Sequence, residues 1–312
     1  MSWSVDDIRS QRGRVAVVTG ANGGLGLQTA TVLAGKGAHV VMAARNQRKA
    51  ASALAQIERL HPGASLEVVE LDLGCLASVE NAAQKIAAEH DHVDMMIANA
   101  GVMAPPEGRT ADGFETQFGI NHLGHWALIS RLLPVIVRTR GARVVTLTSL
   151  AQHTGRPVSR NNPHLRGHYD AWRAYGHSKL AARHFAQGLD RRFRKAGLDA
   201  QALTAHPGLS NTDLQATTVA AGGGGFLGHL FLFWTRNLGM SVEQGALSAL
   251  RAATDPDAEG GSMYGPRFGT NGAPVRKVLL RPGTEKAITT LWEVSRRETG
   301  IDVNVEAALS PG

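Results

Sequence analysis

Tyr175 and Lys179 stand four residues apart in the segment Tyr-Gly-His-Ser-Lys. On a helix this spacing places both side chains on one face, one turn from each other. A free phenol has a pKa of about 10 and is a poor base at neutral pH. A neighbouring ammonium lowers that pKa, which suits a phenol that exchanges a proton with an alcohol or a carbonyl. Solvated pairs show the same spacing, so the rest of the chain must supply a cofactor, a second polar donor and a pocket.

A glycine-rich turn over residues 19–26, Thr-Gly-Ala-Asn-Gly-Gly-Leu-Gly, joins the first strand-like run to the first helical stretch. Glycines permit positive φ and a close approach of backbone to pyrophosphate, and the helix N-terminus attracts the anion. A tight turn without a ligand is the alternative, but the strand before and the helix after favour a dinucleotide-binding loop. The expected cofactor contacts here are Gly20, Asn22, Gly23, Gly24, Leu25 and Gly26.

The second strand-like run ends in Ala44, Arg45 and Asn46, without an acidic residue. An acid at this point binds the ribose 2′-hydroxyl of NAD, whereas an arginine pairs with the 2′-phosphate of NADP. The pattern therefore predicts NADP(H), with an exposed helix-start arginine as the alternative. Further cofactor contacts are expected after the third and fourth strands: Asp72 and Leu73 at the adenine edge, and Asn99, Ala100 and Gly101 under the adenosine ribose.

Apolar runs alternate with helical stretches and predict an α/β fold with a doubly wound (Rossmann) parallel sheet of about seven strands, covered by helices on both faces. The expected strands are 15–18, 39–43, 66–71, 93–98, 142–147, 198–205 and a seventh near 261–264. The expected helices are 25–36, 46–60, 77–89, 114–137 and 174–195, with a bend or an end at Pro134. We interpret residues 1–312 as a single domain.

The composition narrows the classes of function. The 312 residues are 43% hydrophobic and include one cysteine, Cys75, so no internal disulfide forms and a cytoplasmic location is expected. The net charge is +7, but the basic residues are scattered, which argues against a nucleic-acid partner. No apolar run reaches the ~20 residues of a membrane span.

Together these motifs resemble the short-chain dehydrogenases/reductases, in the order that the family shows, over residues 14 to 212. The further matches are Asn121, Ser149, the Tyr175/Lys179 pair and Pro207-Gly208. Finer matches resemble the retinol-dehydrogenase-like branch, which includes relatives of WW-domain oxidoreductase. They lie at residues 43–46, 118–126, 174–181 and 205–208.

The resemblance implies a catalytic tetrad of Asn121, Ser149, Tyr175 and Lys179. Tyr175 would exchange a proton with the substrate oxygen, and Ser149 would hydrogen-bond the same oxygen. Lys179 would lower the phenol pKa and bind the nicotinamide ribose, while Asn121 would hold a water that links Lys179 to solvent. Taken singly, Ser149 is equally a helix cap and Asn121 equally a polar residue at a helix bend. Pro207, Gly208, Leu209 and Thr212 would lie along the nicotinamide and its phosphates.

The resemblance also places the substrate cover after the Pro-Gly turn. We expect 14–205 to form the cofactor-binding and catalytic core, 206–240 a substrate lid, and 241–312 the rest of the sheet and pocket. The apolar stretch 226–234 contains Phe231 and Trp234, which would contact the substrate together with Ser149 and Tyr175. For this stretch a subunit contact ranks second and shallow membrane docking third.

The predicted function is an NADP(H)-dependent oxidoreductase for a bulky hydrophobic carbonyl or alcohol, such as a retinoid, steroid, quinone or lipid aldehyde. The alternative is a non-catalytic NADP(H)-binding sensor or scaffold on the same fold. A homo-oligomer is expected, paired through helices 114–133 and 174–195. No metal site is expected, because the histidines that invite one lack i,i+4 pairing and paired carboxylates: His122, His125, His153 and His206.

Overall fold

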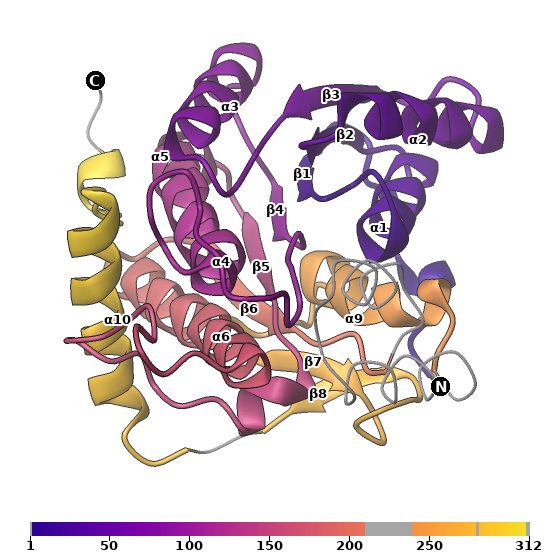
Figure 1. Ribbon diagram of the computed structural model, residues 1–312. Coiled ribbons are helices and arrows are strands. Elements are labelled where there is room, and N and C mark those ends of the chain that lie inside the picture. Colours follow the sequence, from indigo (N-terminus) through magenta and orange to yellow (C-terminus); the bar gives the residue numbers. More distant parts are fainter. Residues whose placement is uncertain (1, 210–238, 279–280, 310–312) are drawn as a thin grey trace.

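The computed structural model describes residues 2–209, 239–278 and 281–309 (Figure 1). Within these residues eight strands form one sheet in the order β3-β2-β1-β4-β5-β6-β7-β8. The strands are β1 Val15–Thr19, β2 His39–Ala44, β3 Leu66–Glu70, β4 Met95–Ala98, β5 Arg143–Leu147, β6 Gln201–Ala205, β7 Met263–Pro266 and β8 Pro274–Lys277.

The sheet is parallel from β3 to β7 and is doubly wound. The chain runs outward from β1 to β3 and then crosses back to β4, so the direction of winding changes between β1 and β4. Ligands of such sheets bind at the carboxyl ends of the strands beside that switch point. The predicted fold class is confirmed, and the eighth strand is an addition. β8 pairs antiparallel with β7 at the sheet edge, and its short Pro-Val-Arg-Lys sequence lacks the apolar run that identifies a buried strand.

Two hydrophobic cores cover the two faces of the sheet, because successive strand residues point to opposite sides. Val17 faces the core shared with α3 (Leu76–Glu89), α5 (Gly124–Val137) and α6 (Ala171–Lys195). Ala16 and Val18 face the other core, shared with α1 (Gly24–Gly35), α2 (Gln47–Leu60) and α9 (Val242–Thr254). Figure 1 shows α10 (Thr284–Thr299) lying outside α6.

The stretch expected as one helix over 114–137 divides into three parts. They are α4 (Thr116–Phe118), a π-helical turn η2 (Gly119–Leu123) and α5. Pro134 lies inside α5, and the helix continues to Val137, so the helix does not end at Pro134. None of the described helices is long and apolar enough to cross a membrane.

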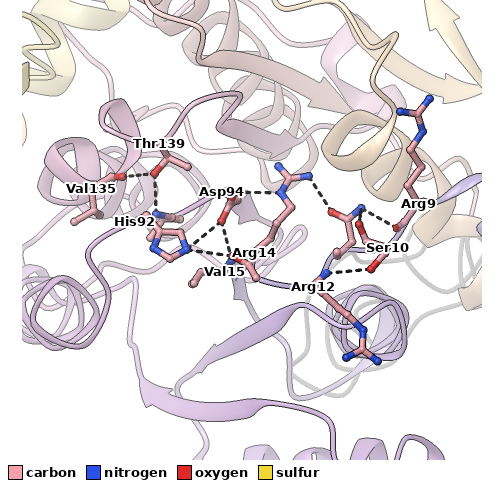
Figure 2. Close-up of polar contacts among 12 residues, drawn as sticks. Arg9, Ser10, Arg12, Arg14, Val15, His92, Asp94, Val135 and Thr139 are labelled. Carbon is pink, nitrogen blue, oxygen red and sulfur yellow. Dashed lines mark hydrogen bonds and ion pairs between the residues drawn. The ribbon is translucent and has the colours of Figure 1, made fainter.

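Asp94 lies at the amino ends of β1 and β4 and makes hydrogen bonds there (Figure 2). Its carboxylate accepts hydrogen bonds from the backbone N–H of Val15 at 2.8 Å and from Nε of Arg14 at 3.1 Å. Nearby, Thr139 Oγ1 accepts from the N–H of Val93 and donates to the carbonyl of Val135. These bonds join the start of β1, the loop before β4 and the end of α5.

Candidate active site

Tyr175 and Lys179 lie one turn apart on α6, and both side chains are buried. Nζ of Lys179 is 5.7 Å from the centre of the Tyr175 ring and donates a hydrogen bond to the carbonyl of Leu147 at 3.2 Å. The hydroxyl of Thr148 donates to the Lys179 carbonyl at 2.8 Å, which fixes α6 against the carboxyl end of β5. Tyr175 and Lys179 thus face the carboxyl ends of the parallel strands.

Ser149 follows β5 and reaches the same place. Its side chain is hydrogen-bonded to Tyr175, so the two hydroxyls meet in one site. The Ser149 oxygen also accepts from the N–H of Ala151 at 3.3 Å and caps the 3-10 helix η3 (Leu150–His153). The cap and the contact with the tyrosine therefore coexist on one side chain.

Asn121 lies in the π-helical turn, and its side-chain amide is fully engaged. Nδ2 donates to the carbonyl of Val102 and to Ser178 Oγ, both at 2.9 Å, and Oδ1 accepts from the Val102 N–H at 2.8 Å. A Cβ on Gly101 would lie 2.9 Å from Asn121 Oδ1 and 3.3 Å from Lys179 Nζ. The segment that follows β4 is thus packed directly on the asparagine and the lysine.

Burial governs the protonation of the pair. It raises the pKa of Tyr175 to about 12, against a smaller lowering by the bond from Ser149. Burial also lowers the pKa of Lys179 to about 8. In the protein alone, desolvation of the phenolate outweighs the lowering by Ser149. The expected lowering of the phenol pKa by the Lys179 ammonium stays a prediction. At neutral pH Tyr175 carries its proton and Lys179 is largely charged.

The glycine loop is built around two residues at positive φ, Gly20 at +67° and Gly24 at +50°. A Cβ on Gly26 would lie 2.3 Å from the carbonyl oxygen of Gly20, so only glycine allows α1 to approach the loop this closely. Gly23 caps α1 without a side-chain hydrogen bond, and no atom lies within 4 Å of where its Cβ would be. No side chain caps the first turn of α1, as expected of a helix N-terminus whose N–H groups bind an anion such as a pyrophosphate.

Asn99 and Ala100 close the switch point between β1 and β4. Asn99 Nδ2 donates to the carbonyl of Thr19 at 2.8 Å, and the N–H of Ala100 donates to Thr19 Oγ1 at 2.9 Å. Thr19 Oγ1 is also 2.9 Å from Nε2 of His125. These bonds hold the glycine loop against the segment 99–101. Both expected cofactor-binding segments therefore lie together at the carboxyl ends of β1 and β4.

Arg45 follows β2 with a side chain that is 72% exposed, and its Nη1 lies 3.8 Å from Oδ2 of Asp72. Asp72 Oδ1 accepts from the N–H of Gly74, and Asn46 Oδ1 caps α2 by accepting from the N–H of Lys49. Leu73 is buried. The structure thus places Arg45 and Asp72 together on the surface, and Leu73 in the core.

A cavity of about 330 Å³ opens between the glycine loop and α2. Its lining includes Asn22 together with Arg48 and Lys49 of the first turns of α2. The sequence analysis did not select Arg48 and Lys49. The sequence does show this basic pair just after Arg45, but only the fold shows that α2 lies alongside the glycine loop.

Pro207, Gly208 and Leu209 follow β6 at the same edge. Gly208 has a φ of +75°, and its N–H donates to Nδ1 of His206 at 3.1 Å. The N–H of Leu209 donates to the carbonyl of Thr270, and the N–H of Met240 donates to the carbonyl of Leu209. The expected contacts Thr212, Phe231 and Trp234, and most of the expected lid, lie outside the described residues.

Three of the histidines weighed as metal ligands are engaged with other groups. His122 Nε2 is 2.7 Å from Ser295 Oγ, His125 Nε2 contacts Thr19, and His206 Nε2 is 2.8 Å from the carbonyl of Gly269. His153 lies on the surface, in η3. Burial lowers the pKa of His122 to about 3 and those of His125 and His206 to about 4, so these three rings are neutral.

A doubly wound sheet, a glycine loop at its switch point and a Ser-Tyr-Lys cluster at the carboxyl ends of its strands define a nicotinamide-dependent oxidoreductase site. The short chain dehydrogenase family model matches residues 14–222, and the chain belongs to that family. Within it the chain lies in the retinol-dehydrogenase-like branch. It is 34% identical to mouse retinol dehydrogenase 11 over 292 residues, covering 94% of this chain and 88% of that protein.

Solved structures agree on the fold. An uncharacterised protein from Mycobacterium paratuberculosis is 37% identical, with a TM-score of 0.79. The match covers 97% of this chain and all of that chain. A short chain dehydrogenase from Shigella flexneri, described as complexed with NADP, has a TM-score of 0.63 at 20% identity, over 83% of this chain and 99% of that chain.

Proposed function

We propose that this oxidoreductase transfers a hydride between NADP(H) and a bulky hydrophobic carbonyl or alcohol. One observation carries the proposal: the Ser149 and Tyr175 hydroxyls meet beside Lys179. They lie at the carboxyl ends of the strands, where the glycine loop also lies. The nicotinamide supplies the hydride when it is bound.

The residues act on the substrate oxygen in carbonyl reduction. Ser149 donates a hydrogen bond to this oxygen and stabilises the charge that develops on it. Tyr175, protonated at neutral pH, gives its proton to the same oxygen. Lys179 holds a positive charge next to the tyrosine and binds the ribose. The Asn121 amide fixes the segment after β4, so a water linking Lys179 to solvent would bind to the Asn121 backbone carbonyl.

The choice of NADP(H) rests on charge after β2. Arg45 is exposed there without an acidic residue beside it in sequence, and Arg48 and Lys49 line the adjoining cavity. Three cationic side chains near the adenosine ribose favour a 2′-phosphate. The solved relative from Shigella flexneri that is complexed with NADP supports the same choice.

Replacing Arg45 tests this choice. Arg45→Ala should lower kcat/KM for NADPH by about 10-fold to 100-fold, the range expected for a lost charged hydrogen bond, and leave NADH almost unchanged. Arg59→Ala, at the exposed far end of α2, is the matched control. Equal losses with both cofactors, or a wild-type enzyme that prefers NADH, would contradict the proposal.

The substrate class is proposed from the retinol dehydrogenase relatives and from the apolar stretch 226–234. Consumption of NADPH should be followed with retinal, a steroid ketone, a quinone and a long-chain aldehyde, against acetaldehyde as the small comparison. We expect the highest kcat/KM with one of the bulky apolar carbonyls. Higher kcat/KM with acetaldehyde would overturn the substrate class while leaving the cofactor proposal standing.

A further inference from the structure

Two histidines and a glutamate lie close together at the amino ends of the strands, at the end of the sheet opposite the catalytic residues. His39 begins β2, Glu67 lies near the start of β3, and His90 caps the C-terminus of α3. One nitrogen or oxygen from each of the three lies within 4.8 Å of the other two. Glu67 Oε1 is 2.8 Å from His90 Nε2 and 3.8 Å from His39 Nε2, and the two ring centres are 4.9 Å apart.

The polar atoms of this cluster are incompletely satisfied. His39 Nδ1 is 2.7 Å from Ser65 Oγ, while His39 Nε2 is buried without a hydrogen-bond partner. If Nδ1–H donates to the serine, the lone pair of Nε2 points toward Glu67. This is the arrangement of a metal-binding histidine, whose second nitrogen is held by a neighbouring acceptor.

The charges of the cluster also favour a cation. Glu67 lies close to the exposed Glu89 carboxyl, which adds a second acidic group to the cluster. Lys85 is a further charged group that acts on Glu89 from the same helix.

We propose that His39, Glu67 and His90 bind one divalent transition-metal ion, of which Zn²⁺ is the best match to two imidazoles and a carboxylate. Tetrahedral Zn²⁺ with bonds of ~2.1 Å places its ligand atoms about 3.4 Å apart. The contacts of 2.8 Å and 3.8 Å lie on either side of this value. Water or Glu89 completes the coordination. Binding requires the proton on Nε2 of His90, which now faces Glu67, to move to Nδ1 or to solvent.

The ion would tie α3 to β2 and β3, which already pair with each other in the sheet. Because the catalytic residues lie at the other ends of the strands, the ion acts on stability and not on hydride transfer. The inference is independent of the proposed substrate and cofactor. The sequence analysis expected no metal site, and these ligands come from three separate elements.

The full chain, treated with a chelator and dialysed, should be titrated with Zn²⁺ by calorimetry and with Co²⁺ by visible absorption. We expect one ion per chain, a Co²⁺ spectrum of a four-coordinate site and a higher Tm with Zn²⁺. Glu67→Gln keeps the shape and a hydrogen-bond acceptor but should weaken binding by ~100-fold or more. Ser65→Ala keeps all three ligands and should weaken it by about 10-fold.

His92→Asn is the matched control, because His92 lies at the same edge but pairs with Asp91 and Asp94. It should bind the ion as the wild type does. The proposal is overturned by a wild-type chain that binds no ion at one equivalent, or by unchanged affinity in both Glu67→Gln and Ser65→Ala. Circular dichroism in chelator checks that each variant folds, and Ser65→Ala decides the question if Glu67→Gln does not.

Discussion

At the scale of single residues, the site depends on where Tyr175 keeps its proton. A buried phenol with a pKa of about 12 is a proton donor at neutral pH, whereas a base at that pH would need a phenolate. Lys179, with a pKa lowered to about 8, is still charged at pH 7 and is a cation beside the ring that can stabilise the phenolate after the proton has left. This state of the free enzyme suits carbonyl reduction.

Tyr175→Phe removes only the hydroxyl and should lower kcat for carbonyl reduction by about 10² to 10⁴, the usual value of a positioned proton donor. NADPH should still bind, as measured by quenching of protein fluorescence. Tyr264→Phe is the control, because its hydroxyl bonds the N–H of Glu259 behind β7, away from the site. Full turnover in Tyr175→Phe would refute the mechanism. A wild-type chain that binds NADPH but turns over none of the carbonyls would instead support the non-catalytic sensor.

At the scale of elements, α10 lies against α6 through one aromatic side chain. Trp292 stacks with the Arg192 guanidinium at 3.9 Å and lies 5.5 Å from the Phe185 ring and 5.0 Å from the Trp126 ring. A Cβ on Gly188 would lie 2.4 Å from Trp292, so a glycine in α6 makes room for the indole. This part of α6 belongs to the stretch to which the sequence analysis assigned subunit pairing. Trp292 thus occupies part of α6, and subunit pairing through helices 114–133 and 174–195 stays a prediction.

Trp292→Ala should lower the free energy of unfolding by about 3 to 5 kcal/mol, because it leaves a cavity between α5, α6 and α10. Urea denaturation followed by circular dichroism measures the change. Leu309→Ala, which truncates an exposed side chain near the C-terminus, should change it by less than about 0.5 kcal/mol. A loss of under 1 kcal/mol in Trp292→Ala would show that α10 is not held in this way.

The apolar stretch 226–234 is proposed as the substrate lid, and the hydrogen bond from Met240 to Leu209 brings its two flanks together beside the Pro-Gly turn. Phe231→Ala and Trp234→Ala should raise KM for a bulky apolar carbonyl at least ~5-fold more than for a small one. Steady-state kinetics with NADPH held saturating gives the comparison. Equal changes for both substrates would favour a subunit contact or a membrane contact instead.

At the scale of the whole molecule, buried histidines link stability to pH. Burial lowers the pKa of His122 to about 3 and those of His125, His184 and His206 to about 4, against an ordinary value of 6.5. The unfolded chain takes up protons near pH 6.5, and the folded chain does so only near pH 3 to 4. Their contribution is therefore complete above pH 6.5 and is lost as the pH falls toward 4.

The free energy of unfolding should fall between pH 6.5 and 4.5 by up to about 1.4 kcal/mol per pH unit for each such histidine. His122→Asn should reduce this slope by one proton, and His168→Asn, at an exposed position, should not change it. Urea midpoints at four pH values measure the slopes. A wild-type stability that stays constant over this range would contradict the assigned cause.

Local patterns in the chain were enough to identify the fold class and the family, and to predict the glycine loop and the tetrad as the site. They act over short distances: the spacing on a helix, the glycines at positive φ, and the apolar runs that become parallel strands. The tertiary structure decided the rest, because burial and long-range contact depend on residues far apart in the chain. Desolvation raised the pKa of Tyr175, the fold placed Arg48 and Lys49 beside Asn22, and three distant elements brought His39, Glu67 and His90 together.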